Sequence, residues 1–325
     1  MSDPLNFSLS FSVPVQKEEL YDAIIIGGGP AGLTAGLYLA RYKLKTLMIE
    51  KAITSGGQLA TTEWVENYPG FPQPVLGSKL AADMETQAKN FGLQIVREGV
   101  TSVDFSKKVK EVRTDHDVYK AKAILITTGA SPRKLGLPGE DEYHGRGVSY
   151  CATCDGPFYP DKLLAVVGGG NSALQESLFL ARYARELTII HRRDKFTAEP
   201  LLIEKAKANP KIKIQMNKQV TGLDFSNAEE RKLILEDVNT SEKSELRVDG
   251  LFIFIGEKPN TALFKDILDL KGEFLVTDAH HRTNVEGVYA AGDVEVKEVR
   301  QVATAVGDGC EAAHWINEYV ENWTE

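Results

Sequence analysis

Two stretches of the chain carry the same order of apolar and polar positions. In the first stretch an apolar, isoleucine-rich run covers residues 21–26, a glycine-rich turn follows, and apolar residues at helical spacing cover residues 33–42. A second apolar run covers residues 46–49. Short β-branched runs favour strands, and apolar residues three or four positions apart favour helices. The pattern therefore predicts a strand, a turn, a helix and a second strand.

The same layout recurs further along the chain. A strand is predicted at residues 163–167, a helix at 174–183 and a second strand at 187–190, again with a glycine-rich turn after the first strand. The turns begin at Gly27 and Gly168, so the two copies are 168 − 27 = 141 residues apart. This internal repeat predicts an α/β fold with two Rossmann-like dinucleotide-binding domains.

Each turn has the spacing of a dinucleotide-binding motif. The first glycine permits the tight turn, the second lets the backbone approach a pyrophosphate, and the third small residue keeps helix and strand close. These residues are Gly27, Gly29 and Gly32 in the first motif and Gly168, Gly170 and Ala173 in the second. A bound pyrophosphate would lie at the helix N-terminus, where unpaired N–H groups favour anions.

The residues at the ends of the second strands differ between the copies. Glu50 and His191 each lie 23 residues after the first glycine of their motif (50 − 27 and 191 − 168). A carboxylate accepts hydrogen bonds from ribose hydroxyls and repels a 2′-phosphate, so the first site suits FAD or NAD. In the second site Arg192 and Arg193 follow His191, and guanidinium groups match a phosphate. The second site therefore favours NADPH, with a solvated basic turn as the alternative.

Further apolar runs and their interruptions predict how the domains are connected. The runs at residues 123–128 and 251–255 are each followed by glycine, and proline and polar residues break the pattern near 131–132 and 257–260. We therefore predict that the second domain is inserted into the first. The predicted boundaries are 1–131 and 260–325 for the first domain and 132–259 for the second, which carries a cysteine pair.

Composition and charge limit the classes of binding partner that the protein can have. Hydrophobic residues make up 42% and charged residues 26%, with a formal net charge of −8 and an isoelectric point near 5.5. This charge argues against nucleic acid as a partner, and no apolar run approaches the roughly 20 residues that cross a bilayer. The first twenty residues lack the basic start and apolar core of a signal peptide. We expect a cytoplasmic protein with no membrane partner and a soluble extension at residues 1–20.

The sequence Cys-Ala-Thr-Cys-Asp at residues 151–155 is the candidate reactive element. Cysteines at this spacing at a helix start can form a disulfide, and the helix dipole lowers the pKa of the first thiol. A zinc site is disfavoured because there is no second cysteine pair, and a purely structural disulfide is the other alternative. Asp155 is a candidate proton donor to a departing thiolate, or an ordinary helix-start carboxylate. The third cysteine, Cys310, is predicted to be a buried small hydrophobe.

The motifs together resemble the low-molecular-weight thioredoxin reductases of bacteria and archaea, a class of FAD- and NAD(P)-dependent disulfide oxidoreductases. The resemblance covers about residues 20–322, and the cysteine run is its most specific part. The matching segments are residues 27–32, 56–59, 66–70, 151–156, 168–173, 191–193, 292–293 and 300–301.

The resemblance implies the following sites. FAD would contact Gly27, Gly29, Gly32, Glu50, Gly57, Gln58, Asn67, Val103, Asp293, Arg300, Gln301 and Val302. NADPH would contact Gly170, Asn171, Ser172, Ala173, His191, Arg192 and Arg193. Cys154 would face the flavin, and Cys151 would attack the disulfide of thioredoxin. Relatives are commonly homodimers, so a homodimer is also expected.

One position departs from the family pattern. The family carries a further arginine four residues after the second arginine of the phosphate motif, and this chain has Thr197 there, with Lys195 nearby. The loss of one guanidinium contact corresponds to roughly ten- to hundredfold in affinity. NADH or another electron donor therefore stays open as an alternative to NADPH.

Other readings of the same motifs involve different partners. A flavoprotein that serves a peroxiredoxin would carry an extra N-terminal pair of thioredoxin-like modules, and a ferredoxin–NADP reductase would lack the cysteine pair. A redox-sensing flavin-binding protein would turn nothing over. Phe158 and Tyr159 follow the cysteines, and we expect them either to dock the protein partner or to pack in the core.

The predicted arrangement also requires movement. The nicotinamide and the cysteine pair would both belong to the inserted domain, yet both must reach one flavin at near-attack distances of about 3–3.5 Å. We therefore expect the inserted domain to rotate about the two interdomain segments.

Overall fold

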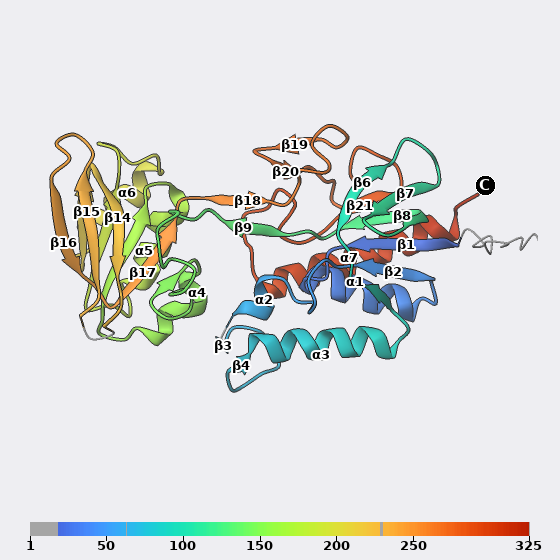
Figure 1. The fold of residues 1–325 in the computed structure, drawn as a ribbon, viewed down its shortest axis with the longest axis horizontal. Helices are drawn as coiled ribbons and strands as arrows, with labels where there is room; N and C mark the ends of the chain where they lie inside the picture. The colour runs from blue at the N-terminus through green and yellow to red at the C-terminus, as the bar shows by residue number, and fades with distance from the viewer. Residues whose placement is uncertain (1–18, 63, 228–229, 325) are drawn as a thin grey trace, which may run out of the picture.

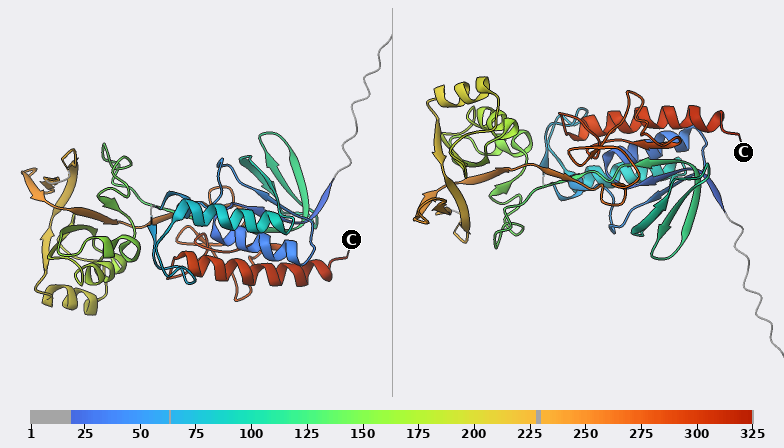
Figure 2. Two further views of the ribbon diagram at one scale, coloured as in Figure 1. Left: turned by 90° about the horizontal axis from the view of Figure 1, so that it is seen from below. Right: turned by 90° about the horizontal axis from the view of Figure 1, so that it is seen from above.

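The computed structural model describes residues 19–62, 64–227 and 230–324, which form two lobes joined by a narrow connection (Figures 1 and 2). Most of the predicted extension, residues 1–18, lies outside the described residues. The first lobe contains both the N-terminal part of the described chain and its C-terminal helix, and the second lobe is formed by the middle of the chain.

The first lobe is built on a sheet with the strand order β5-β2-β1-β8-β7-β6, in which β21 also pairs with β8. The neighbours β5, β2, β1, β8 and β21 are parallel, whereas β6 and β7 are antiparallel. The strands are β1 (Leu20–Ile26), β2 (Thr46–Ile49), β5 (Gln94–Val96), β6 (Val100–Asp104), β7 (Lys110–Thr114), β8 (Val118–Ile126) and β21 (Val288–Ala290).

Strand β1 separates the two cores of this lobe because its side chains alternate between the faces of the sheet. Ala23 and Ile25 pack with the helices, and Ile24 and Ile26 pack on the opposite face. The helices on the first face are α1 (Pro30–Arg41), α3 (Gly77–Asn90) and α7 (Val302–Glu321). Helices α1 and α7 approach closely, since a Cβ at Gly309 would lie 2.2 Å from the carbonyl oxygen of Ala31.

Short elements complete the first lobe at the end that faces the second lobe. Helix α2 and the hairpin of β3 and β4 lie there beside the start of α3 (Figure 1). These elements, with the small hairpin of β19 and β20, are α2 (Gln58–Thr61), β3 (Trp64–Val65), β4 (Val75–Leu76), β19 (Leu270–Lys271) and β20 (Phe274–Leu275).

The second lobe is built on a parallel sheet with the order β10-β17-β11-β12-β13. Helices cover one face, and the antiparallel sheet β14-β15-β16 covers the other. The strands are β10 (Val148–Ser149), β11 (Leu163–Gly168), β12 (Glu186–His191), β13 (Ile212–Met216), β14 (Lys218–Asp224), β15 (Lys232–Asp237), β16 (Lys243–Arg247) and β17 (Gly250–Phe254). The helices are α4 (Ala152–Asp155), η1 (Gly156–Phe158), α5 (Asn171–Leu180) and α6 (Pro200–Ala208).

The two lobes are joined by a paired ribbon. Strands β9 (Ala130–Pro132) and β18 (Glu257–Pro259) pair in antiparallel register, with Glu257 opposite Pro132. The segments predicted as irregular interruptions are therefore extended strands, and the predicted boundaries fall within this ribbon or directly after it. Each X-Pro step favours an extended backbone, which suits such a ribbon.

The predicted fold class is confirmed, since each lobe contains a parallel sheet with the strand, glycine turn, helix and strand order. The prediction for Cys310 is only partly right, because the residue is half-buried and its thiol interacts with the Tyr38 hydroxyl. Among the described residues, no helix is both long and apolar enough to cross a membrane.

Candidate active site

The first glycine motif forms an open cradle at the start of α1. Gly27 has a φ of +106°, and a Cβ there would lie 2.5 Å from the carbonyl oxygen of Thr127. A Cβ at Gly32 would lie 2.1 Å from the carbonyl oxygen of Gly27. A Cβ at Gly29 would meet nothing within 4 Å. Two of these glycines thus allow close backbone packing, and Gly29 leaves space above the helix N-terminus for a ligand.

Glu50 closes one side of this cradle. Its Oε2 accepts a hydrogen bond from the Gly28 N–H at 2.6 Å, and its Oε1 accepts one from the Ala52 N–H at 2.7 Å. These bonds fix the carboxylate at the end of β2. Because each carboxylate oxygen has a second acceptor position, ribose hydroxyls can still donate to it.

Asp293 is the strongest structural sign of a ligand in the first lobe. Its Oδ1 is buried and has no hydrogen-bond partner among the described residues. Burial raises the pKa of Asp293 to about 6, against the smaller opposing effect of Lys297. Buried polar atoms are nearly always hydrogen-bonded, so a group that donates hydrogen bonds is expected here. The hydroxyl-rich ribityl chain of a flavin fits this requirement.

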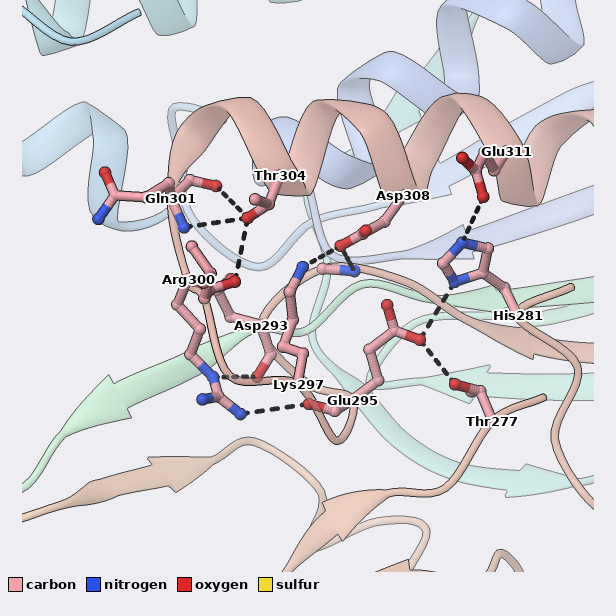
Figure 3. A network of polar contacts seen from close by, with 12 residues as sticks. Thr277, His281, Asp293, Glu295, Lys297, Arg300, Gln301, Thr304, Asp308 and Glu311 are labelled. Carbon is pink, nitrogen blue, oxygen red and sulfur yellow. Dashed lines mark hydrogen bonds and ion pairs between the residues drawn. The ribbon is translucent and has the colours of Figure 1, made fainter. Parts of the chain in front are cut away.

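A polar network holds the loop around Asp293 in place (Figure 3). The Arg300 guanidinium donates to the backbone carbonyls of Asp293 at 3.4 Å and Glu295 at 3.2 Å. Lys297 pairs with Asp308 of α7, which also accepts from the Gly292 N–H at 3.2 Å. The loop is therefore braced by backbone and charge contacts that leave the Asp293 carboxylate oxygen unused.

The remaining residues predicted to contact FAD lie on several elements of the first lobe. Gly57 precedes α2, Gln58 donates to the Ala130 carbonyl at 2.6 Å, and Val302 begins α7. Val103 lies in β6 and packs against the core on the far face of the sheet. The cavity between the lobes is lined by Gln58, Asn67, Asp293, Arg300, Gln301 and Val302.

The second glycine motif repeats the tight turn but differs in its surroundings. A Cβ at Gly168 would lie 2.4 Å from the carbonyl oxygen of Phe254, whereas the nearest atom to a Cβ at Gly170 is Thr197 Oγ1 at 3.8 Å. Asn171, a predicted NADPH contact, already has partners within the protein. Its Nδ2 donates to the Glu199 carboxylate at 3.1 Å, and its Oδ1 accepts from the Glu199 backbone N–H at 2.8 Å. Ser172 is exposed and Ala173 is buried.

His191 lies beneath the second glycine loop. Its Nε2 is 3.0 Å from the Lys195 carbonyl oxygen, and a Cβ at Gly169 would lie 2.2 Å from the imidazole ring. Burial, with a further contribution from the Arg193 and Arg192 charges, lowers the pKa of His191. The ring is therefore neutral at pH 7, and the positive charge at this strand end comes from the exposed Arg192 and Arg193.

Thr197 is exposed, and both its backbone N–H and its hydroxyl bond the glycine loop. Its backbone N–H donates to the Gly169 carbonyl at 2.8 Å and its hydroxyl does so at 3.3 Å. The residue that replaces the family's third arginine thus holds the loop of the second motif and contributes no charge.

Cys151 and Cys154 are joined in a disulfide. The helix that follows Cys151 is only one turn long, α4, so the predicted dipole effect is small and individual donors matter more. The Cys154 N–H donates to Cys151 Sγ at 3.2 Å. Asp155 accepts a hydrogen bond from the Ser149 hydroxyl at 2.5 Å, which fixes the carboxylate beside the disulfide.

The two aromatic residues after the disulfide have different environments. Tyr159 packs edge-on against Phe252, with ring centroids 5.6 Å apart, and it fills the space above Gly250. Phe158 remains 43% exposed and lines the cavity beside the disulfide. Tyr159 thus packs in the core but is half-buried and also lines the cavity, and Phe158 is the more exposed of the two.

A cavity of about 1460 Å³ lies between the lobes and brings both halves of the site together. The disulfide, Asp155 and Phe158 line it from the second lobe, opposite Asp293 and Arg300 of the first. Ser172 also reaches this cavity, whereas Gly27, Gly29, Glu50 and the strand end at His191 lie outside its lining.

Direct contacts cross the cavity between the lobes. Gln301 Nε2 donates to the Thr153 hydroxyl at 3.2 Å, and Asn67 Nδ2 donates to Gln301 Oε1 at 3.0 Å. Arg300 pairs with Glu257 of the ribbon at 2.9 Å. In this arrangement the disulfide turn is therefore held against the first lobe.

Some residues of the site have no signal in the sequence. Glu176 lines the cavity from α5, its Oε2 is buried without a partner among the described residues, and burial raises its pKa. Thr153 and Glu257 make their contacts across 148 and 43 residues of chain (301 − 153 and 300 − 257). Only the folded arrangement reveals such contacts.

Comparison with known proteins identifies the family of this chain. Residues 21–309 match the family described as pyridine nucleotide-disulphide oxidoreductase. The thioredoxin reductase of Bacillus subtilis (strain 168) is 45% identical over 312 residues, which cover 96% of this chain and 98% of the relative. The chain belongs to the pyridine nucleotide-disulphide oxidoreductase family, whose members use a flavin and a pyridine nucleotide.

Two solved thioredoxin reductase structures resemble this chain to different degrees. The thioredoxin reductase from Streptococcus pyogenes MGAS5005 is 39% identical, covers 94% of this chain and 100% of its own, and has a TM-score of 0.87. The thioredoxin reductase of Lactococcus lactis in the FR conformation is 38% identical, covers 93% and 100%, and has a TM-score of 0.65. The curated relative and both solved structures are thioredoxin reductases, and each matches this chain over nearly its whole length.

Proposed function

We propose that the protein is a thioredoxin reductase that passes electrons from NADPH through FAD and the Cys151–Cys154 disulfide to oxidised thioredoxin. The observation that carries this proposal is the disulfide itself, which lines the cavity between two lobes that each contain a dinucleotide motif. The similarity to thioredoxin reductases over nearly the whole chain supports the same activity.

The first lobe is proposed to hold FAD. Gly29 would lie under the pyrophosphate, Glu50 would accept from the adenosine ribose, and Asp293 would accept from the ribityl hydroxyls. Arg300 and Gln301 would border the flavin ring at the cavity. The orphaned Asp293 oxygen is the feature that most directly supports this placement.

The roles proposed for the two cysteines are those that the family resemblance implies. When bound, reduced nicotinamide and flavin supply the electron pair that opens the disulfide. The Cys151 thiolate then attacks one sulfur of the partner disulfide, forming a mixed disulfide while the other partner sulfur leaves as a thiolate. The Cys154 thiolate displaces the partner and restores the Cys151–Cys154 bond. Asp155, fixed by Ser149, is placed to hold the proton that a departing thiolate requires.

Rotation of the second lobe is proposed as part of the cycle. The Streptococcus pyogenes and Lactococcus lactis structures match this chain with nearly equal identity and coverage but different TM-scores. Because sequence divergence cannot explain that difference, a different placement of the lobes is the simplest account. The ribbon of β9 and β18 is the natural axis for such a rotation. A disulfide engineered between the lobes should stop turnover, and full turnover in the cross-linked protein would contradict rotation.

NADPH is proposed as the donor because Arg192 and Arg193 are exposed at the end of β12. Thr197 is directed at the Gly169 carbonyl, which supports a weaker phosphate site than the family pattern has. Selectivity over NADH is therefore expected to be modest. The partner is proposed to be thioredoxin or a thioredoxin-like protein, approached beside Phe158. A homodimer is proposed from the sequence resemblance alone, and light scattering of the purified protein would test its mass. A cytoplasmic location is also proposed, as the sequence analysis expects.

The decisive experiment is reduction of thioredoxin by the purified yellow protein, with NADPH, NADH and reduced ferredoxin supplied in parallel. We expect turnover with NADPH, slower turnover with NADH and none with ferredoxin. Cys151→Ser and Cys154→Ser should abolish it, and Cys310→Ser is the matched control. A colourless protein, or disulfide reduction that survives either active-site serine, would refute the proposal. Turnover with a peroxiredoxin but not with thioredoxin would reassign the partner.

A further inference from the structure

The two sulfurs of the disulfide have different hydrogen-bonding environments. Cys151 Sγ accepts from the Cys154 N–H at 3.2 Å and lies 3.5 Å from the Thr153 hydroxyl. Hydrogen bonds to the charged form of a group favour that form. A thiolate is a much stronger acceptor than a disulfide sulfur, so both donors gain strength when the bond opens and charge collects on Cys151.

The direction of the Thr153 hydroxyl is set from the other lobe. The Gln301 Nε2 group is only a donor, so at 3.2 Å the Thr153 oxygen must accept from it. The Gln301 amide is itself fixed, because its Oε1 accepts from Asn67 at 3.0 Å. With its oxygen engaged by Gln301, Thr153 can donate its single proton toward Cys151.

We propose that Thr153 is a positioning residue whose hydroxyl stabilises the Cys151 sulfur as a thiolate, and that Gln301 of the other lobe orients that hydroxyl. This inference deepens the proposed function and rests on it. When an electron pair from the enzyme's two-electron donor reaches Cys154, that sulfur becomes a thiolate, the S–S bond breaks and its bonding pair leaves on Cys151 as a second negative charge. Thr153 and the Cys154 N–H hold that charge until a proton arrives. Because the Gln301 contact spans the lobes, Gln301 can orient the Thr153 hydroxyl only while the disulfide faces the first lobe.

The test measures the thiol itself and needs no turnover. Full-length protein is reduced with dithiothreitol, freed of reductant and alkylated with iodoacetamide across a range of pH, and mass spectrometry separates Cys151 from Cys154. Thr153→Val removes the hydroxyl and keeps the shape, and Thr153→Ser is the conservative control. The charged side chains and the histidine that line the cavity stay constant in these variants; they are Lys134, Asp141, His144, Arg146, Asp155, Lys162, Glu176, Arg231, Asp249, Glu257, Asp293, Glu298 and Arg300.

We expect Thr153→Val to shift the alkylation profile of Cys151 to higher pH, with about tenfold slower alkylation below the thiol pKa. Thr153→Ser should match the wild type, and the Cys154 profile should move little. An unchanged Cys151 profile in a folded, flavin-bearing Thr153→Val protein would overturn the proposal. If that variant does not fold, Thr153→Ala provides the same comparison, and an unchanged Ala profile overturns it equally.

A double-mutant cycle tests the role of Gln301. Gln301→Met should slow Cys151 alkylation about two- to threefold in the wild-type background, since cooperative polarisation of the hydroxyl is lost. In the Thr153→Val background the same change should have no effect. Equal effects in both backgrounds would overturn the orientation by Gln301. These outcomes remain distinct from failure of the proposed function, because alkylation requires neither NADPH nor thioredoxin.

Discussion

The two glycine motifs share one backbone design and differ in what lies at the end of the second strand. In the first lobe, Glu50 is tied by two backbone N–H groups above an open Gly29. In the second, His191 is a neutral ring beneath Gly169, and charge is supplied by exposed arginines. Under the proposed cofactor assignment, the glycines set the shape of a dinucleotide site, whereas the strand end sets which nucleotide it accepts.

The largest expected effect comes from exchanging the third small residue of the two motifs. Gly32→Ala would place a Cβ 2.1 Å from the Gly27 carbonyl oxygen, whereas Ala173 already carries a Cβ at the equivalent position. We expect Gly32→Ala to cost about 3 kcal/mol and to lose flavin. The control Ala173→Gly should cost about 1 kcal/mol. For each variant, visible absorbance per protein measures the flavin content, and the thermal midpoint measures the stability. Similar values for the two variants would mean that the motifs pack alike.

The second prediction concerns the arginines of the second motif. The double variant Arg192→Ala with Arg193→Ala should raise the KM for NADPH about ten- to hundredfold and leave the KM for NADH nearly unchanged. A matched control removes two charges from α6 of the same lobe, Lys205→Ala with Lys207→Ala. Steady-state kinetics with both nucleotides decides. If the α6 control has the same effect, the arginines act only through overall charge.

A smaller gain is expected from restoring the family pattern. Thr197→Arg should lower the KM for NADPH about tenfold, because one charge-assisted hydrogen bond is added. Thr197→Ala removes only the hydroxyl contact with the Gly169 carbonyl and should change the KM little. No preference for NADPH over NADH in the arginine variant would show that the phosphate lies elsewhere.

The smallest expected effect is on the pH dependence of stability, which should differ in sign between two buried histidines, one from each lobe. Burial lowers the pKa of His191, so its unfolded form takes up a proton first and stability falls as the pH drops below about 6.5. For His281, burial also acts to lower the pKa, but Glu295, Asp308 and Glu311 outweigh it and raise the pKa. That stabilisation is complete below about 6.5 and is lost as the pH rises through the folded value.

Replacement of each histidine by asparagine therefore has opposite pH dependence. The thermal midpoint of His281→Asn should fall further below wild type at pH 5.5 than at pH 8.5, and that of His191→Asn should fall further at pH 8.5. In free energy of unfolding, the difference between the two pH values is expected to be about 1 kcal/mol for each variant, the usual scale of one hydrogen bond. A shared direction for the two variants would contradict the assigned shifts.

The sequence predicted the parts of the fold that depend on local patterns. Strand β2 has the predicted bounds, and β1 and β11 agree within a residue, because continuous apolar runs between turn signals leave little choice of register. The ribbon of β9 and β18 was not predicted, because all its residues except Ala130 are polar or proline and its pairing joins segments 125 residues apart (257 − 132). Pairing between distant segments produces no repeating pattern of apolar and polar residues that the sequence could show.

The candidate site shows the same division. The glycines, the strand ends and the cysteine pair follow from spacing, since their chemistry requires fixed residue types at fixed intervals. The unpartnered oxygen of Asp293 and the Gln301–Thr153 contact depend on how distant segments pack. The neutral state of His191 also depends on burial, which residue type alone does not reveal.

The ribbon has a mechanical consequence. Because the chain leaves the first lobe in β9 and returns in β18, and the two strands are hydrogen-bonded side by side, neither can slide or splay alone. A two-stranded ribbon carries a larger strand twist than a wide sheet. If the second lobe rotates as proposed, both strands must change their twist together, so we expect a stiffer ribbon to slow that rotation without touching a reacting atom.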